Sequence, residues 1–370
     1  MTTRRYRVAQ WATGDTGKRA LREVIRHPAM DLVGVLTYNP GKDGVDAGEL
    51  CGEAPTGIRA TTDRKAIQSL GADCVVYMPR ATGTGVSRAG LTQDELVDDL
   101  VPMLEAGTNI VTTCTDLLAR GIRLGPERLA RLNRACAKGG SSIWASGSDP
   151  GFITETLPFA LLSVQRRVDL IEIEEYGDLS HRPSPHMVMV QMRFGKPLDE
   201  FDPERRKTHL FGEYQPPLTV LADAAGFTVD EWTATGGAAA ASKDTAIVSG
   251  EIKAGTAAAQ KVVITGRSKG KDVIRFTQYA YVTLDTDPDW DLRPTGWRVR
   301  VHGDAPFDVA LPLPVSLDVL ADHVPAYNAN GPVNAIPYVC DARPGILTTE
   351  DLPIILPRGP RPAETEAEAE

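Results

Sequence analysis

The strongest constraint on the fold is a short segment near the N-terminus, where an apolar run meets a glycine turn. It reads Val8-Ala9-Gln10-Trp11-Ala12-Thr13-Gly14-Asp15-Thr16-Gly17-Lys18. This pattern predicts a buried strand, a tight turn and a helix that opens at Lys18. A glycine in such a turn lets the backbone approach a diphosphate, which the N-terminus of the helix then binds. We therefore expect Thr13, Gly14, Asp15, Thr16 and Gly17 to hold a dinucleotide. Ala12 stands where the G-x-G-x-x-G pattern has its first glycine, so an ordinary strand–helix turn is the alternative.

Strands and helices alternate through the first part of the chain. Apolar strand patterns occur at 32–36, 72–78, 109–113 and 142–146, and helical spacing occurs at 95–106 and 126–138. Alternation of this kind predicts a doubly wound parallel sheet of the Rossmann type, with ligands at the carboxyl ends of its strands. We assign residues 1–150 to this NAD(P)-binding domain.

The pattern changes to a period of two after about residue 168. Segments 169–176, 261–266 and 274–282 alternate apolar and polar residues, which predicts a mixed, largely antiparallel sheet with one solvated face. The fold class is thus α/β, a Rossmann-type sheet plus an α+β domain at 151–320 that binds substrate and forms a dimer. We expect 233–242, rich in Gly and Ala, to be a flexible surface connection, and the acidic residues 358–370 to be a disordered tail.

The composition excludes several classes of function. The chain has 370 residues, a net charge of -9 and a mean hydropathy of -0.19. No apolar run has membrane length, and the acidic balance disfavours nucleic acid. Five scattered cysteines and six scattered histidines show no metal-ligand spacing, so we expect reduced thiols, a cytoplasmic location and no metal.

The end of the second predicted strand bears on the choice of cofactor. NAD-preferring sites place Asp or Glu there to bind the ribose 2′-hydroxyl. The sequence Leu36-Thr37-Tyr38-Asn39-Pro40-Gly41-Lys42 has no carboxylate, and Lys42 could pair with a 2′-phosphate. We therefore assign Asn39 and Lys42 to the cofactor site and predict NADP, with NAD possible. The alternative is that Lys42 is an exposed loop lysine.

Four separated segments carry a family resemblance. They are 11–17 (Trp-Ala-Thr-Gly-Asp-Thr-Gly), 41–52 (Gly-Lys-Asp-Gly-Val-Asp-Ala-Gly-Glu-Leu-Cys-Gly), 147–152 (Gly-Ser-Asp-Pro-Gly-Phe) and 333–337 (Val-Asn-Ala-Ile-Pro) with Pro344-Gly345. In order and spacing the chain resembles the dihydrodipicolinate-reductase-like NAD(P)-dependent oxidoreductases, in the branch of 2,4-diaminopentanoate dehydrogenase and the native amine dehydrogenases. The dihydrodipicolinate reductases themselves are disfavoured, because their Lys-Lys and Gly-Thr cluster for a diacid is missing.

The resemblance implies a homodimer and a C-terminal segment, 321–357, that returns to the Rossmann domain. It places Gly147 and Phe152 beside the nicotinamide, Asn334 and Ile336 on the other side of the pocket, and Met78, Pro79 and Arg80 at the cofactor ribose. It also implies reductive amination of a ketone or aldehyde with ammonia and NADPH or NADH.

The same resemblance locates a catalytic carboxylate just after the strand that ends at Cys114. The family has Cys or Ala and then two glutamates, whereas this chain has Cys114-Thr115-Asp116. We expect Cys114 at the cofactor and Asp116, with Thr115, in catalysis, because they follow a parallel strand at its ligand end. An N-cap is the alternative for Asp116. Asp149 is the second carboxylate, with a cap of the helix at 154–162 as its alternative.

The second domain supplies the candidate substrate pocket. Alternation places Glu174 and Tyr176 on one face and Glu175 on the other, so one set at most enters the pocket. Met187, Met189 and Phe152 suggest an apolar wall that suits a hydrophobic carbonyl compound, although the methionines could be core. His181 and His186 flank a possible lid and could donate a proton, or they could be solvated loop residues.

Three functions follow from these residues. The first is an NADPH-dependent enzyme of the amine dehydrogenase type that acts on a hydrophobic ketone or aldehyde with ammonia, in either direction. The second keeps the hydride transfer but reduces a ketone or preformed imine without ammonia. The third is a non-catalytic sensor that binds NADP.

Overall fold

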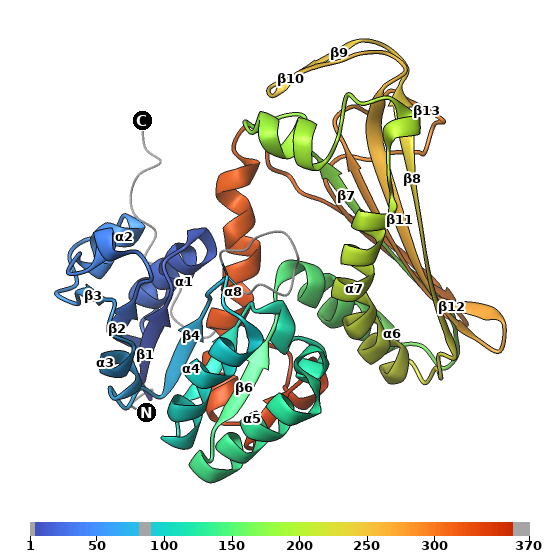
Figure 1. Ribbon diagram of the computed structural model, residues 1–370. Coiled ribbons are helices and arrows are strands. Elements are labelled where there is room, and N and C mark those ends of the chain that lie inside the picture. The colour runs from blue at the N-terminus through green and yellow to red at the C-terminus, as the bar shows by residue number, and fades with distance from the viewer. Residues whose placement is uncertain (1–3, 81–89, 358–370) are drawn as a thin grey trace, which may run out of the picture. The chain divides into compact units, whose positions relative to one another are not determined.

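The computed structural model describes residues 4–80 and 90–357, which form two compact units (Figure 1). Unit 1 comprises Met1–Gly151 and Val324–Glu370, and unit 2 comprises Phe152–His323. Unit 1 is therefore built from both ends of the chain, and unit 2 is a continuous insertion. The acidic tail predicted at 358–370 lies outside the described residues.

Unit 1 contains a seven-stranded sheet in which all neighbouring strands are parallel. The strand order is β16-β6-β5-β4-β1-β2-β3. The strands are β1 (Tyr6–Trp11), β2 (Met30–Leu36), β3 (Ala60–Thr61), β4 (Cys74–Tyr77), β5 (Asn109–Thr112), β6 (Ser142–Ala145) and β16 (Gly345–Leu347). The order reverses between β1 and β4, which is where ligands bind in folds of this type. The predicted Rossmann-type sheet is confirmed.

Both faces of this sheet are covered by helices because the side chains of buried parallel strands alternate between two apolar cores. Ala9, Val75 and Tyr77 pack with α4 and α5, whereas Val8 and Val76 pack with α1 and α8. The helices of this unit are α1 (Asp15–Arg26), α2 (Ala47–Cys51), α3 (Arg64–Gln68), α4 (Gln93–Glu105), α5 (Gly125–Gly139) and α8 (Leu320–Cys340), with 3-10 turns η1 (Pro40–Lys42), η2 (Thr115–Leu117), η3 (Ala119–Leu124) and η7 (Thr349–Asp351).

Unit 2 contains a mixed seven-stranded sheet in the order β13-β8-β11-β12-β7-β14-β15. Its strands are β7 (Val168–Asp178), β8 (Glu231–Ala241), β11 (Ala257–Ser268), β12 (Lys271–Tyr281), β13 (Thr286–Asp287), β14 (Gly296–Gly303) and β15 (Phe307–Pro312). Only the β7–β12 pair is parallel among the described strands of this sheet. A hairpin of β9 (Thr245–Ile247) and β10 (Gly250–Ile252) extends from it. The predicted mixed, largely antiparallel sheet is confirmed.

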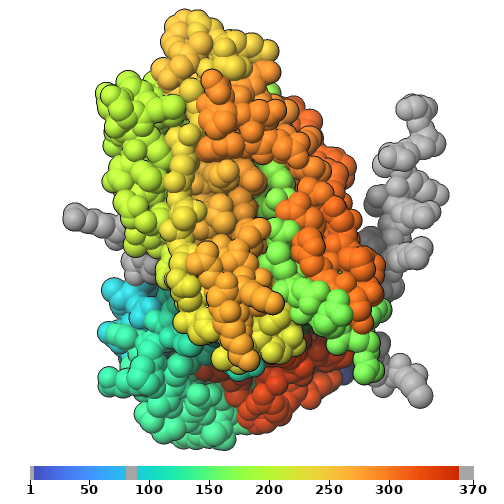
Figure 2. Space-filling model, turned by 90° about the vertical axis from the view of Figure 1, so that its right-hand side faces the viewer, coloured from blue at the N-terminus to red at the C-terminus, as the bar shows by residue number. Residues whose placement is uncertain are grey.

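One face of the unit 2 sheet is apolar and the other is polar. Helices α6 (Leu157–Leu162) and α7 (Glu204–Ala224) cover the apolar face, where Ile173, Phe276 and Val299 pack against Leu218 (Figure 1). Figure 2 shows the helix-free face, where green β7 runs between the lighter orange β12 and the deeper orange β14. Acidic residues of β7 pair with arginines of β12 and β14 on this face.

The structure corrects two local predictions. Residues 233–242 are not a flexible connection, because 231–241 form strand β8, which pairs along its length with β11. Tertiary pairing overrides the low strand preference of the small residues, and Ala239 is fully buried. Helix α1 begins at Asp15 rather than at Lys18, with Gly14 as its N-cap. Within the described residues, no helix has the length and apolar character needed to cross a membrane.

Candidate cofactor and active site

The turn between β1 and α1 has the backbone of a dinucleotide turn even though its first glycine is replaced. Ala12 adopts a φ of 75°, in the left-handed region that favours glycine. Gln10 stabilises this conformation, because its side-chain Nε2 donates to the Ala12 carbonyl at 2.9 Å. Among the described residues, the N-cap position of α1 is Gly14, which provides no side-chain cap. The first backbone N–H groups of α1 are therefore available to an anion.

The two remaining glycines of the turn have different surroundings. A Cβ atom on Gly17 would lie 2.3 Å from the Ala12 carbonyl oxygen, so only glycine lets the helix approach the turn this closely. A Cβ atom on Gly14 would meet nothing within 4 Å, which leaves open space at the N-terminus of α1. The turn thus has both features that a diphosphate requires: a closely packed helix and an open approach to its N-terminus.

Lys42 lies against this turn from the segment that follows β2. Its Nζ donates to the Thr13 carbonyl oxygen at 2.8 Å and lies 3.4 Å from Thr13 Oγ1. The first carboxylate after β2, Asp43, accepts hydrogen bonds from Thr62 instead. The side chain of Asn39 accepts from the Gly41 N–H and fixes the turn. Lys42 is therefore a cation held at the turn, while the carboxylate of Asp43 is engaged by Thr62.

The ends of β4 and β5 supply the next groups. Met78, Pro79 and Cys114 are buried, and the Cys114 Sγ donates to the Pro79 carbonyl at 3.4 Å. Burial raises the pKa of the Cys114 thiol to about 12, so it stays protonated at neutral pH. Thr115 follows, and its buried Oγ1 has no hydrogen-bond partner in the described part of the chain. A buried hydroxyl without a partner is unfavourable, and a bound polar group would satisfy it.

Asp116 lies in η2 and is 1% exposed. Its Oδ1 accepts from Gln93 Nε2 at 3.0 Å and pairs with Arg123 Nε at 3.5 Å. Both contacts are made by the same oxygen atom. Asp116 is not an N-cap, which was its alternative role, because Cys114 and Leu118 occupy the N-cap positions of η2 and η3.

The loop after β6 is fastened by a residue that the sequence analysis missed. Asn328 of α8 accepts from both the N–H (3.0 Å) and the hydroxyl (2.9 Å) of Ser148. Gly147 lies in the same contact, since a Cβ atom there would be 3.2 Å from Asn328 Oδ1. Asp149 has extended backbone, with φ -156° and ψ 112°, ahead of the helical turns. A single Asn inside a helical pattern gives no local signal of this contact.

The other residues predicted from the resemblance lie in α8, and their burial differs. Ile336 is fully buried in the core beneath α8 and Asn334 is partly exposed. The partly exposed Asn334 is open to contact with a ligand, whereas Ile336 is enclosed in the core.

In unit 2 the predicted pocket residues are dispersed. Phe152 is 40% exposed, whereas Met189 packs against a core cluster that includes Phe194, as the alternative interpretation stated. Tyr176 stacks on Tyr279 with ring centroids 5.0 Å apart and donates to Glu174, so both lie on the helix-free face. Glu175 lies on the opposite face, where it accepts from Tyr214 of α7. Met187 is half-buried, and His181 and His186 are exposed.

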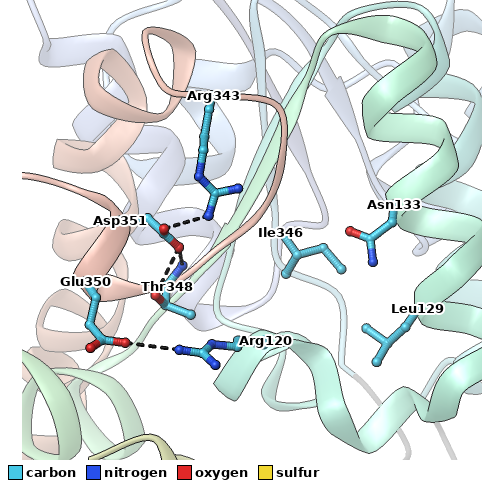
Figure 3. Close-up of a pocket in the computed structure, with 8 residues that line it drawn as sticks. All are labelled: Arg120, Leu129, Asn133, Arg343, Ile346, Thr348, Glu350 and Asp351. Carbon is cyan, nitrogen blue, oxygen red and sulfur yellow. Dashed lines mark hydrogen bonds and ion pairs between the residues drawn. The ribbon is translucent and has the colours of Figure 1, made fainter. Parts of the chain in front are cut away.

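A pocket of about 300 Å³ in unit 1 lies away from the turn (Figure 3). Its charged residues are paired with one another, Arg120 with Glu350 at 3.1 Å and Arg343 with Asp351 at 2.6 Å. It is formed around β16, which is four strands from β1 in the sheet. Because neighbouring strands lie about 4.8 Å apart, this pocket is roughly 20 Å from the glycine turn and is not the cofactor cradle.

A doubly wound parallel sheet with an open anion-binding turn at its switch point, joined in one chain to a mixed-sheet unit, defines an NAD(P)-dependent oxidoreductase. The cradle fits a dinucleotide in two respects: the space at Gly14 and the open N-terminus of α1. The family model described as the 2,4-diaminopentanoate dehydrogenase C-terminal domain matches residues 152–359. The chain belongs to this family.

Comparisons over the whole chain agree with that assignment. An amine dehydrogenase from Streptomyces virginiae is 29% identical over 360 residues, which cover 93% of this chain and 95% of the relative. The solved structure of an amine dehydrogenase from Mycobacterium smegmatis superposes with a TM-score of 0.70 at 17% identity, covering 95% of this chain and 97% of that one. A scyllo-inositol dehydrogenase from Lactobacillus casei, solved with NAD(H) and scyllo-inositol, gives 0.52 at 10% identity, covering 90% and 89%. The two structures support the fold, and the predicted family is confirmed.

Proposed function

We propose that the chain is an amine dehydrogenase that reductively aminates a hydrophobic ketone or aldehyde with ammonia and NADPH, and catalyses the reverse oxidative deamination. The observation that carries this proposal is the 29% identity to an amine dehydrogenase across 93% of the chain. The apolar side chain of Phe152, 40% exposed at the start of unit 2, supports a hydrophobic substrate.

The preference for NADPH rests on Lys42. Its ammonium group is fixed 2.8 Å from the Thr13 carbonyl, while the neighbouring carboxylate of Asp43 accepts from Thr62. A 2′-phosphate at this place would gain a charge-assisted hydrogen bond. NAD, which lacks this phosphate, would lose that interaction.

The proton steps fall to residues that follow β5. Bound NADPH supplies the hydride, and the protein must hold ammonia and move protons. We assign these steps to Asp116, whose Oδ1 is held by Gln93 and Arg123 and whose Oδ2 is the oxygen that would accept a proton. The Thr115 hydroxyl would bind the polar group of a ligand beside it. Because Asp116 is 1% exposed, substrate access requires movement of the groups that cover its carboxylate.

The reaction is tested directly by mixing purified protein with NADPH, ammonium chloride and a panel of aldehydes and cyclic ketones. We expect oxidation of NADPH that requires ammonia. Turnover of the same ketones without ammonia would favour the second reading, a reductase of ketones or preformed imines. Tight NADPH binding without turnover of any carbonyl compound would favour the sensor.

Lys42→Ala tests the cofactor preference. We expect the KM for NADPH to rise by about 10-fold or more, because a hydrogen bond to a charged group is lost, while the KM for NADH changes little. Lys138→Ala is the control, since Lys138 is an exposed lysine of the same unit that pairs with Glu105. Equal effects of Lys42→Ala on both cofactors would refute a role at the 2′-phosphate.

Asp116→Asn tests the carboxylate. Loss of a general acid–base group predicts a fall in kcat of about 100-fold or more, with the Kd for NADPH unchanged. The exposed Asp94 of α4, which pairs with Arg128 of α5, provides the control variant Asp94→Asn. If turnover survives in Asp116→Asn, the carboxylate has only a structural role.

We further propose a cytoplasmic homodimer that associates through the helix-free face of the unit 2 sheet. Figure 2 shows that the described helices leave the strands of this face uncovered, and this supports its use by a second copy of the chain. Sedimentation equilibrium of the purified protein tests the oligomeric state, and a monomer at micromolar concentration would contradict it.

A further inference from the structure

A buried carboxylate in the middle of α4 connects several elements of unit 1. Asp99 is 2% exposed, and its Oδ2 accepts from the hydroxyls of Tyr38 (3.2 Å) and Tyr77 (3.0 Å). Its Oδ1 accepts from Arg64 Nη1 at 2.7 Å. Trp11 Nε1 donates to the Tyr38 hydroxyl at 2.7 Å. Burial raises the pKa of Asp99, an effect that the Arg64 cation and the two tyrosine donors oppose.

The partners of Asp99 come from the ligand-binding edge of the sheet. Trp11 and Tyr77 are the last residues of β1 and β4, and these strands are neighbours at the switch point. Tyr38 lies two residues beyond the end of β2, in the segment that also carries Lys42. Because β1 and β2 are adjacent and parallel, Tyr38 lies beside the glycine turn.

Tyr38 is fixed at its hydroxyl but open at its ring. The residue is 41% exposed although its hydroxyl has two partners in the interior. Arg64 lies against the ring, with its guanidinium carbon 5.3 Å from the ring centroid. A tyrosine needed only for the core would bury its ring, whereas this one presents an immobilised aromatic surface with a cation beside it. Such a surface is suited to stacking a flat base attached to an anionic group.

We propose that Tyr38 stacks on the adenine of the bound dinucleotide, and that Asp99 is a positioning residue that holds Tyr38 and Arg64 in place for it. The proposal rests on nicotinamide dinucleotide binding, but not on the substrate, on ammonia or on the choice between NADPH and NADH. Fixing the ring before the ligand arrives reduces the side-chain entropy lost on binding.

The experiment measures the two halves of the cofactor separately, by calorimetric titration of the full-length protein with ADP-ribose and with nicotinamide mononucleotide. We expect Tyr38→Ala to raise the Kd for ADP-ribose by about 10-fold, as for loss of one base–aromatic contact, and to leave the mononucleotide Kd within about twofold. Tyr38→Phe keeps the ring but loses the hydroxyl that Asp99 and Trp11 hold, so its ADP-ribose affinity should lie between those of the wild type and Tyr38→Ala. Tyr327→Ala, which removes a 38% exposed tyrosine of the same unit, is the matched control.

Asp99→Asn tests the positioning role. We expect weaker ADP-ribose binding and a higher KM for the cofactor with kcat unchanged. In a Tyr38→Ala background, Asp99→Asn should weaken ADP-ribose binding no further, since residues that act through one contact are not additive. Additive losses would show that Asp99 does not act through Tyr38 and would overturn its positioning role.

Several results would overturn the proposal. Unchanged ADP-ribose affinity in a folded Tyr38→Ala variant would exclude stacking, and so would an equal loss for both half-molecules. If Tyr38→Ala melts early, Tyr38→Leu keeps the apolar bulk without the ring and decides the question. If the wild-type protein bound neither ADP-ribose nor nicotinamide mononucleotide, dinucleotide binding itself would be refuted. If both bound but the ammonia-dependent reaction failed, only the proposed reaction would be refuted.

Discussion

Gly14 and Gly17 stand three residues apart in one turn, but only Gly17 is required by the fold itself. Gly17 is needed by the protein, because any side chain would collide with the Ala12 carbonyl. Gly14 has free space around it and ordinary φ, so the fold itself would accept a side chain there. Its requirement comes from whatever approaches the N-terminus of α1.

Paired substitutions separate these two requirements. We expect Gly14→Ala to melt at the wild-type temperature but to bind NADPH about 10-fold more weakly, because its methyl group occupies the space of a diphosphate. Gly17→Ala should lower the free energy of unfolding by about 1–3 kcal/mol, through overpacking against backbone. Thermal melts with and without NADPH measure both effects. A Gly14→Ala variant with unimpaired binding would contradict the assignment of the cradle.

Sequence reasoning at this scale succeeded where a residue's role depends on its immediate neighbours. Gly17 could be placed in the turn because the strand, turn and helix are contiguous, whereas the contact of Lys42 with Thr13 was not predicted. Asn328 and Asp99 could not, since their partners are distant along the chain and only the fold brings them together. Ala12 was an apparent mismatch that its positive φ explains.

At the scale of elements, β8 shows the limit of local pattern. Its Gly-Gly-Ala-Ala-Ala-Ala sequence is typical of a loop, yet it pairs with β11 on one side and β13 on the other. Small side chains let neighbouring parts approach closely: a Cβ atom on Gly236 would be 2.8 Å from Pro203 Cβ. The strongly alternating strands β7 and β12 were predicted because their pattern reports burial directly.

Adjacent glycines of β8 give a matched test of this packing. Gly236→Ala should lower the urea midpoint, with a loss of about 1–3 kcal/mol from overpacking. A Cβ atom on Gly237 meets nothing within 4 Å, so Gly237→Ala should be neutral or slightly stabilising through lower entropy of the unfolded chain. If both substitutions were neutral, the packing around Pro203 would be looser than the structure shows.

At the scale of the whole molecule, unit 2 depends on charge pairs across its helix-free face. Glu172 of β7 contacts Arg275 of β12 (2.7 Å), Arg300 of β14 (3.1 Å) and His302 of β14 (2.7 Å). Burial raises the pKa of Glu172, but His302 and the two arginines lower it further, so the net shift is downward. The pairs therefore stabilise the fold above the ordinary pKa of a glutamate, and this stabilisation is lost as the pH falls through the lowered value.

Glu172→Gln should flatten the acid branch of the stability profile. We expect its urea midpoint to be below that of the wild type at pH 7 and to fall less between pH 5 and pH 3, because the titrating group is gone. Glu251→Gln, at an exposed hairpin glutamate that pairs with Lys253, should follow the wild type. Identical acid branches in all three proteins would show that Glu172 makes no contribution.

The division of the chain is a feature of the whole molecule that local patterns indicate only in part. The start of unit 2 is marked by a change in pattern. Strands and helices alternate before it, whereas apolar and polar residues alternate with a period of two after it, because the two units bury their strands differently. The return of the chain to unit 1 is harder to predict from the sequence. Helix α8 contains Pro325, Pro332 and Pro337, and proline disfavours a helix locally. These prolines are accommodated because α8 is packed in a core.

This division has a consequence for synthesis on the ribosome. One face of the Rossmann sheet is covered by α8, and its edge beside β6 is paired with β16, yet both elements are made after all of unit 2. During translation the first 151 residues cannot complete their fold until residues 324–347 have emerged. Until then the apolar residues around Val111 and Trp144 are uncovered, and the edge of β6 is unpaired. The nascent chain is thus most exposed to misassociation and chaperone capture in the interval when unit 2 is being made.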